Sequence, residues 1–155
     1  MRSDAWSFVA MEYCALVLNR TFVVSIDGER LRGVQCRGLT STAGGRDALT
    51  RYINDRLAVH GDLEDPSSYI GDRRPWHGRR ADFAIPLRDI RSVEHDPRPK
   101  WGMGYYPHDG RIHLRTDACA REFIVLGRQS GRAICAHLRA AAGLAQSLAA
   151  IESTG

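Results

Sequence analysis

The sequence lacks the features that place a chain in several large protein classes. No run of apolar residues approaches the about 18 that a membrane-spanning helix needs. There is no GxSxG motif, no P-loop and no GxGxxG motif, so no short signature of hydrolysis or nucleotide binding is present. No internal repeat and no low-complexity segment is evident. These absences favour a globular protein whose activity is not announced by a motif.

A secretory signal, a disulfide framework and a metal centre are also not expected. Asp4 and Glu12 interrupt the apolar N-terminal stretch, and its longest clean run, Cys14 to Leu18, is short for a signal peptide. The four cysteines form no CxxC pair or similar metal spacing. We therefore expect a cytoplasmic protein with free, mostly buried thiols and with no metal and no cofactor.

The charge of the chain is modest and unevenly distributed. The 155 residues carry a net charge of +4, and the basic residues are densest between Arg73 and Lys100. Lys100 is the only lysine, and such a preference for arginine is what GC-rich coding produces, so it does not by itself indicate phosphate binding. Acidic residues are interspersed and no nucleic-acid-binding module is recognisable, which disfavours nucleic acid as a partner.

The first half predicts a three-strand meander between Tyr13 and Arg37. The runs CALVL and TFVVSI are apolar or rich in β-branched residues, which suit strands, and Asn19-Arg20 is interpreted as the turn between them. Asp27-Gly28 predicts a two-residue hairpin. Gly33 interrupts the alternation of the third strand and suggests a bulge.

Residues from about 40 to 80 are predicted to be an insertion. Leu49, Ile53 and Leu57 recur at helical spacing and predict a helix over 46–60. The connection over 61–80 is rich in Pro, Gly, Asp and Arg, and a connection of that length is either functional or mobile. Its role and the strand pairing within residues 1–80 stay open.

The second half predicts further strands. DFAIPL places Phe83 and Ile85 on one face, and Pro86 indicates an edge strand or its end. RDIRSVEH continues extended, Asp109-Gly110 signals a second hairpin, and RIHLRT alternates with its apolar residues on one face. A turn at Asp117-Ala118 leads into the strand REFIVLG.

A long amphipathic helix is predicted at the C-terminus, with Ser130 as its N-cap. Its apolar stripe of about five turns consists of Ile134, Leu138, Ala141, Ala145, Leu148 and Ile151. The opposite face carries Arg132, Arg139 and Gln146. We expect the stripe to pack against the sheet.

The order of these elements resembles a pleckstrin-homology (PH) barrel. The segments IPLRDIRSVE, KWGMG, GRIHLRT, REFIVLG and ICAHLRAA, within residues 82–142, are similar to the C-terminal half of bacterial PH-like domains. The resemblance implies an α+β fold, namely a single PH-like domain over 1–155. Its bent antiparallel β-barrel or sandwich would have about seven strands, an inserted helix at about 40–80 and a long C-terminal capping helix. It implies little about activity, because a fold does not dictate function.

Two basic, Trp-bearing loops are the first candidate site. Arg98, Lys100 and Trp101 belong to one loop, and Arg73, Arg74 and Trp76 to the other. Cations beside an indole are typical of surfaces that meet anionic head groups. The alternative is a solvated, Arg-rich surface whose indoles pack under their loops. A phosphoinositide site is not expected at the Asn19-Arg20 turn, which is short and poor in cations.

The loop over 94–113 is the second candidate site. Glu94, His95, Asp96 and His108 could form an acid/base or metal site, although no HxxxH or HxH ligand pattern supports one. Tyr105 and Tyr106 could line the mouth of a ligand-binding barrel beside Trp101, or simply pack within their loop.

We therefore expect a non-catalytic PH-like binding or assembly module, either cytoplasmic or peripheral to the membrane. It would meet a protein partner or an anionic membrane surface through its basic Trp-bearing loops. The alternative is a small enzyme or a small-molecule-binding barrel that uses the aromatic, His-rich loop. The identity of the partner and the oligomeric state, a homo-oligomer included, do not follow from the sequence.

Overall fold

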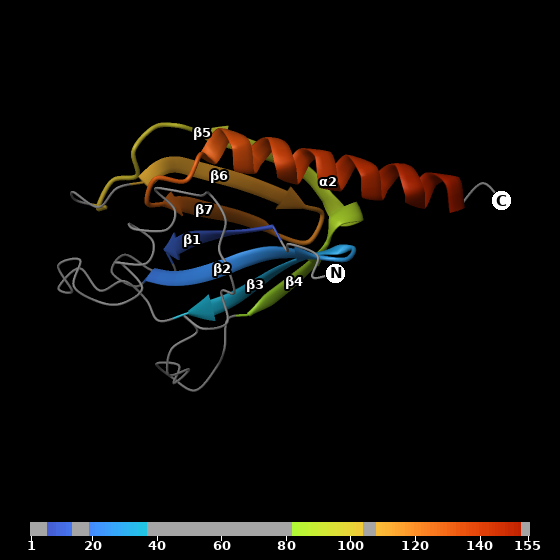
Figure 1. The fold of residues 1–155 in the computed structure, drawn as a ribbon, viewed down its shortest axis with the longest axis horizontal. Helices are drawn as coiled ribbons and strands as arrows, with labels where there is room; N and C mark the ends of the chain where they lie inside the picture. Colours follow the sequence, from blue (N-terminus) through green and yellow to red (C-terminus); the bar gives the residue numbers. More distant parts are fainter. Residues whose placement is uncertain (1–5, 14–18, 37–81, 104–107, 153–155) are drawn as a thin grey trace.

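The fold is that of a computed structural model, which describes residues 6–13, 19–36, 82–103 and 108–152 (Figure 1). Its elements are β1 (Ser7–Tyr13), β2 (Asn19–Asp27), β3 (Arg30–Cys36), β4 (Phe83–Pro86), the 3-10 helix η2 (Leu87–Asp89), β5 (Ile90–Asp96), β6 (His108–Thr116), β7 (Ala120–Leu126) and α2 (Gly131–Glu152). The predicted α+β class, the bent antiparallel sheet and the C-terminal helix are confirmed. The predicted helix over 46–60 and the connection over 61–80 lie outside the described residues.

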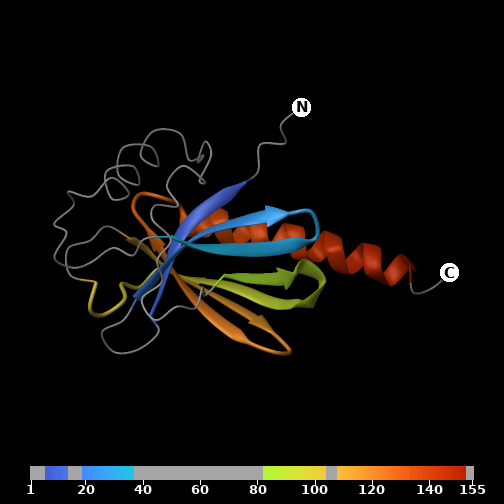
Figure 2. The same cartoon turned by 90° about the horizontal axis from the view of Figure 1, so that it is seen from below.

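The seven described strands form one antiparallel sheet in the order β4-β3-β2-β1-β7-β6-β5. Its two edge strands, β4 and β5, are consecutive in the chain and are joined only by η2. A flat sheet would hold these edges about 29 Å apart, because neighbouring strands lie about 4.8 Å apart. The four peptide links from Pro86 to Ile90 can span at most about 14 Å. The sheet therefore curls into a half-barrel, which Figure 2 shows from below.

The core lies between the concave face of the half-barrel and the N-terminal half of α2. Strand alternation places Phe8, Phe22, Leu31, Ile112 and Phe123 on this face, and each is fully buried. Ile134 and Leu138 of the helix join the same cluster. The predicted division of β6 is confirmed, since Ile112 and Leu114 are buried and the alternating Arg111, His113 and Arg115 are not.

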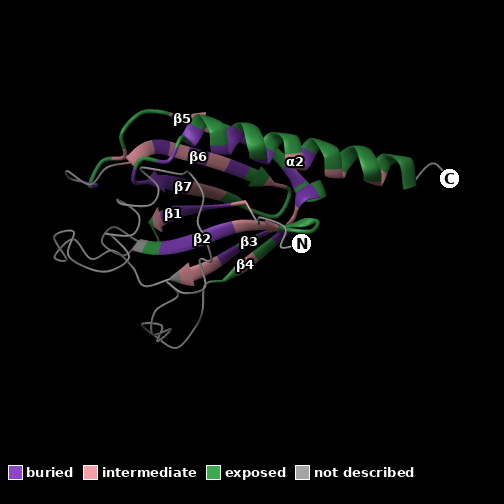
Figure 3. Cartoon of the chain, viewed as in Figure 1, coloured by how far each residue is buried: buried purple, intermediate pink, exposed green. Residues whose placement is uncertain are grey.

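The second half of α2 does not pack as predicted. Ile134, Cys135, Leu138 and Ala142 are buried, but Leu148 and Ile151 of the predicted stripe are exposed (Figure 3). The reason is that the helix is longer than the sheet and runs past its end (Figure 1). By length and composition alone, α2 is also the one helix in the described ranges that could cross a membrane. The buried residues of this helix all lie between Gly131 and Ala142.

The first strand lies earlier than predicted. β1 is SFVAMEY, and Asn19 and Arg20 are not a turn but the start of β2, where they pair with Tyr13 and Glu12. The apolar run over 14–18 attracted the strand prediction and lies outside the described residues. The register is instead fixed by Phe8 and the other inward residues of β1, which belong to the core.

Among the other predicted turns, strand ends and bulges, three are confirmed and two are wrong. The first hairpin is confirmed with its loop shifted to Gly28-Glu29, and Gly28 has φ +58°. Pro86 does end an edge strand, and the chain bends at Asp117-Ala118 between β6 and β7. Asp109-Gly110, however, is an irregularity inside β6, where the register shifts between His108 and Arg111. Gly33 is not a bulge, because its pairing with β2 is continuous; the Phe83 ring occupies the space where a side chain would lie.

Candidate binding site at the Trp101 turn

The most exposed large hydrophobic side chain of the described residues belongs to Trp101, which is 92% exposed. It follows β5 in a four-residue turn, residues 100–103, which we call the Trp101 turn. The N–H of Met103 donates to the carbonyl of Lys100 across 3.4 Å. Gly102, at the third position, has φ +91°, which is the conformation that a type II turn requires there. The glycine thus permits a tight turn that has the indole at its second position.

Contacts on both sides hold the Trp101 turn. The backbone N–H of Lys100 donates to Nε2 of His108 across 3.1 Å, and Nζ of Lys100 lies 2.5 Å from Oε1 of Glu122 on β7. At the other end of the turn, Met103 is buried. The backbone around the indole is therefore anchored to β6 and β7, while the indole itself makes little contact with the protein.

The cations of this loop are paired with carboxylates. Arg98 binds Asp96 in a bidentate fashion, with N···O distances of 2.8 and 2.9 Å. Arg111 on β6 contacts both Asp96, at 2.5 Å, and Glu122, at 3.5 Å. Hydrogen bonds from the Arg98 side chain and backbone, with the charge of Arg111, hold the pKa of Asp96 well below its ordinary value. With Lys100, three cations face two carboxylates, so the described cations beside the Trp101 turn belong to an ion-pair network of nearly balanced charge.

The other half of the predicted surface cannot be placed. Arg73, Arg74 and Trp76 of the second loop lie outside the described residues, and so do Tyr105 and Tyr106. The described part of the predicted binding surface consists of Arg98, Lys100 and Trp101.

The second candidate site, in the loop over 94–113, lies partly in a polar hollow of about 530 Å³ on β5 and β6. Three of its four residues line this hollow, together with Arg98, His113 and Arg115. These three are Glu94, His95 and Asp96. His108 does not line it. Glu94 pairs in register with His113, whose Nδ1 lies 3.8 Å from Oε2 of Glu122. In the parts of the chain that the structure describes, no group of three or more His, Cys, Asp or Glu residues could hold a metal ion.

His95 and His108 each form a hydrogen bond with a backbone group. Nε2 of His95 lies 2.8 Å from the carbonyl oxygen of Asp109, and Nε2 of His108 accepts from Lys100. The carboxylate of Asp109 in turn accepts from the N–H of Gly131, the first residue of α2, across 2.7 Å. These contacts join β5, the irregular start of β6 and the beginning of the helix. The sequence predicts Asp109 as a hairpin residue, and no local pattern links it to Gly131.

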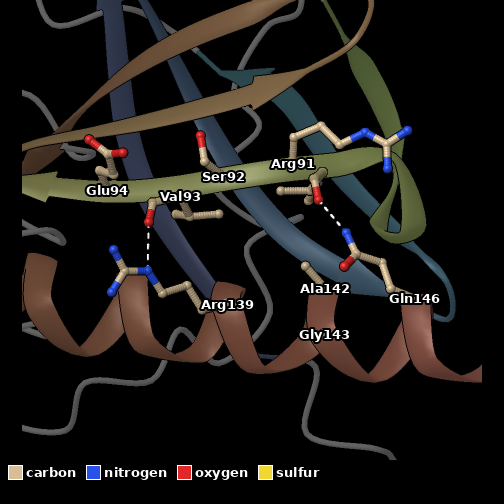
Figure 4. Close-up of a pocket in the computed structure, with 9 residues that line it drawn as sticks. Arg91, Ser92, Val93, Glu94, Arg139, Ala142, Gly143 and Gln146 are labelled. Atoms are coloured by element: carbon tan, nitrogen blue, oxygen red, sulfur yellow. Dashed lines mark hydrogen bonds between the residues drawn. The ribbon is translucent and has the colours of Figure 1, made fainter.

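The open edge of the sheet, β5, is covered by two side chains from α2 (Figure 4). Nε of Arg139 donates to the carbonyl of Val93, and Nε2 of Gln146 donates to the carbonyl of Ile90, each across 2.6 Å. Between these two contacts lies a groove of about 290 Å³, whose helix side includes the small residues Ala142 and Gly143. Covering an edge in this way opposes the addition of another strand.

This edge contact was not predicted. The sequence predicts only that Arg139 and Gln146 lie on the helix face opposite the apolar stripe. Their spacing of seven residues nevertheless places them on one side of the helix, where both reach the β5 backbone. Two polar residues seven positions apart are the only feature of the sequence that could have indicated this contact with β5.

Comparisons of the chain with protein-family models, with curated proteins and with solved structures find no match. A functional assignment has to come from the chemistry of the site.

Proposed function

We propose that the chain is a cytoplasmic, non-catalytic binding module of PH-like fold that engages a protein partner through the Trp101 turn. The observation that carries the proposal is an indole that is 92% exposed on a turn whose neighbouring residues are anchored. Tryptophan is on average a highly buried residue. It is also enriched among the residues that contribute most to protein–protein binding.

The anchoring of the turn supports recognition rather than accidental exposure. An aromatic side chain has few rotatable bonds, and Lys100 and Met103 already hold the backbone around it. Binding would therefore immobilise little that is not already fixed, which lowers the entropic cost of association. A partner with an apolar pocket could bury most of the indole surface.

The balance of charge favours a protein over an anionic membrane. Attraction to such a membrane grows by about 1 kcal/mol for each Lys or Arg near the surface. Arg98, Lys100 and Arg111 are each within ion-pair distance of a carboxylate, so little net positive charge faces outward from this network. An apolar anchor surrounded by ion pairs is the composition of a protein interface, with its apolar centre and polar rim.

The hydrogen bonds of the histidines support a structural role for them. A general acid or base needs a ring nitrogen that can reach the substrate. His95 directs one ring nitrogen to the carbonyl of Asp109 at the start of β6, and His108 directs one to the N–H of Lys100 in the Trp101 turn. The polar hollow beside Glu94 is also unlike a typical small-molecule site, which is mostly apolar.

The proposal is tested by comparative affinity capture with the full chain as bait. The wild type, Trp101→Phe and Trp101→Ala are immobilised at equal density, and the retained proteins are quantified. We expect a protein that the wild type retains, that Trp101→Phe retains partly and that Trp101→Ala loses. Identical retention by all three baits contradicts the proposal.

Vesicle co-sedimentation separates the protein partner from a lipid surface. We expect no more binding to vesicles of phosphatidylcholine with phosphatidylserine than to phosphatidylcholine alone. Binding that falls with salt, and that is lost in Arg98→Ala/Lys100→Ala/Trp101→Ala, would assign the surface to anionic lipid instead.

A further inference from the structure

One of the contacts that hold the Trp101 turn depends on the charge of a histidine. The backbone N–H of Lys100 donates to Nε2 of His108 across 3.1 Å. A backbone N–H can only donate, so Nε2 has to accept, which it does in the neutral imidazole that carries its proton on Nδ1. In the imidazolium both ring nitrogens carry protons and both are donors. The contact therefore exists only while His108 is uncharged.

The contact that His95 makes with the backbone has the opposite chemistry. Its Nε2 lies 2.8 Å from the carbonyl oxygen of Asp109, and a carbonyl oxygen can only accept. Nε2 of His95 is therefore the donor, and it remains a donor when the ring is protonated. Acid thus preserves the contact of His95 and removes the contact of His108, although the two rings lie in neighbouring strands.

The charged groups around the Trp101 turn already have partners. The carboxylates of Glu122, Asp96 and Asp109 are each engaged, so an imidazolium at position 108 would compete with existing contacts for them. The partners of Glu122 are Lys100, Arg111 and His113, those of Asp96 are Arg98 and Arg111, and Asp109 accepts from the N–H of Gly131. Nζ of Lys100 also lies 5.6 Å from the centre of the Tyr13 ring.

We infer that His108 is a pH-dependent switch of the Trp101 turn, which is ordered while the imidazole is neutral and is released when it is protonated. Histidine is the side chain whose charge ordinarily changes between pH 5 and 8, and His108 is only half-buried, so solvent protons can reach it. Protonation removes the acceptor of the Lys100 N–H and sets a second donor against it. Lys100 keeps its ion pair with Glu122, and Met103 is buried, so the release is confined to the backbone of residues 100–102.

The switch regulates binding at the indole of Trp101. An ordered turn loses little conformational freedom when a partner binds, whereas a released turn has to be ordered first, which lowers the affinity. Binding should therefore weaken as the pH falls from 7.5 to 5. This consequence rests on the proposed function. The change in the turn does not, and it is measured without a partner.

The test of the switch is NMR of the full, isotopically labelled chain between pH 7.5 and 5. The ring nitrogens of His108 report its tautomer and its charge. We expect the Nδ1–H tautomer at pH 7.5, and order parameters for the Trp101 and Gly102 amides that fall from about 0.85 to below about 0.6 with the same midpoint as His108. A neutral His108 with its proton on Nε2, or turn amides whose order is unchanged while His108 titrates, overturns the inference.

Three variants assign the response to one ring. His108→Gln supplies an amide oxygen that accepts at every pH, so its turn should stay ordered at pH 5. His108→Lys has only donors, so its turn should be released already at pH 7.5. His113→Gln removes the histidine beside Glu122 and should leave the response unchanged. Unaltered β2 amide shifts verify that each variant is folded. A response that persists in His108→Gln, or that disappears in His113→Gln, overturns the assignment to His108.

Affinity capture at the two pH values tests the effect on binding. Wild-type and His108→Gln baits are compared for the protein whose retention depends on Trp101. We expect the wild type to retain at least about tenfold less of it at pH 5 than at pH 7.5, and His108→Gln to retain equal amounts. Equal loss from both baits at pH 5 contradicts the regulation by His108. If no retained protein depends on Trp101 at either pH, the proposed function fails, whereas the NMR result decides the switch by itself.

Discussion

The guanidinium of Arg139 donates a hydrogen bond to the carbonyl oxygen of Val93, across 2.6 Å, and so joins α2 to the outermost strand of the sheet (Figure 4). Gln146 repeats the contact two turns later at Ile90. The closing helix therefore has two functions in the fold. It supplies apolar side chains to the core, and it covers the backbone of an edge strand that would otherwise be open to pairing.

Removing both contacts should weaken the fold and uncover the edge. We expect Arg139→Ala/Gln146→Ala to lose about 2 kcal/mol of unfolding free energy, or about 1 kcal/mol for each hydrogen bond. We also expect it to self-associate, because an uncovered edge is a template for strand addition. Urea denaturation and light scattering measure the two effects. Arg132→Ala, an exposed change on the same helix, is the control, and a double variant that behaves like it would refute the assigned role.

Two glycines should respond to alanine with opposite signs. At Gly33 the added methyl group would collide with the Phe83 ring, so we expect a loss of about 1–3 kcal/mol, as is usual for overpacking. At Gly143 nothing lies within 4 Å of the added atom, so alanine should stabilise the helix by about 0.5–1 kcal/mol. Urea denaturation of both variants is the measurement. A Phe83→Leu change that fails to relieve Gly33→Ala would show that the collision is not the cause.

Asp96 should remain ionised at a pH where ordinary aspartates are half protonated. Its pKa is depressed, so its contribution to stability is present above about pH 3.9, the ordinary value, and is lost as the pH falls through the depressed pKa. Carbon-13 NMR of the side-chain carboxyl follows this titration directly. We expect Arg98→Ala to raise the pKa of Asp96, because Arg98 makes the largest contribution to the depression. An Asp96 that titrates near pH 3.9 in the wild type would be inconsistent with the ion-pair network.

Trp101 and Met103 should differ sharply in their effect on stability, although both belong to one turn. Trp101→Ala removes a side chain that is almost wholly exposed, so the unfolding free energy should change by less than about 0.5 kcal/mol. Met103→Ala removes a buried side chain and should cost about 2 kcal/mol or more. Chemical denaturation of the two variants checks both values. A large loss for Trp101→Ala would mean that the indole supports the fold rather than being available to a partner.

The parts of the fold that could be predicted are those that local chemistry determines. The alternation of Ile112 and Leu114 with polar residues located β6 correctly, and Ser130 does cap α2, since its Oγ accepts from the N–H of Ala133 across 3.2 Å. The structure at Asp109-Gly110 could not be predicted from the neighbouring sequence alone. The same dipeptide suits a hairpin and a strand irregularity, and the choice depends on Asp96 and Pro97, whose backbone lies against Gly110.

The exposed indole stands beside cations in the sequence, but the partners of those cations could not be predicted. Trp101 was identified beside Arg98 and Lys100, and the structure leaves its indole exposed. The partner of Lys100 is Glu122, which lies 22 residues later on another strand. Only the strand order that brings β6 and β7 beside the loop reveals this pairing.

The most direct test of the Trp101 turn as a protein-binding site is site-specific photo-cross-linking in the cells that produce the protein. A photoreactive phenylalanine derivative replaces Trp101 in one strain and the exposed Arg128 in another, and cross-linked products are identified by mass spectrometry. We expect a defined protein cross-link from position 101 that is absent from position 128. Cross-links from position 101 to lipid alone, or the same products from both positions, would contradict the proposed function.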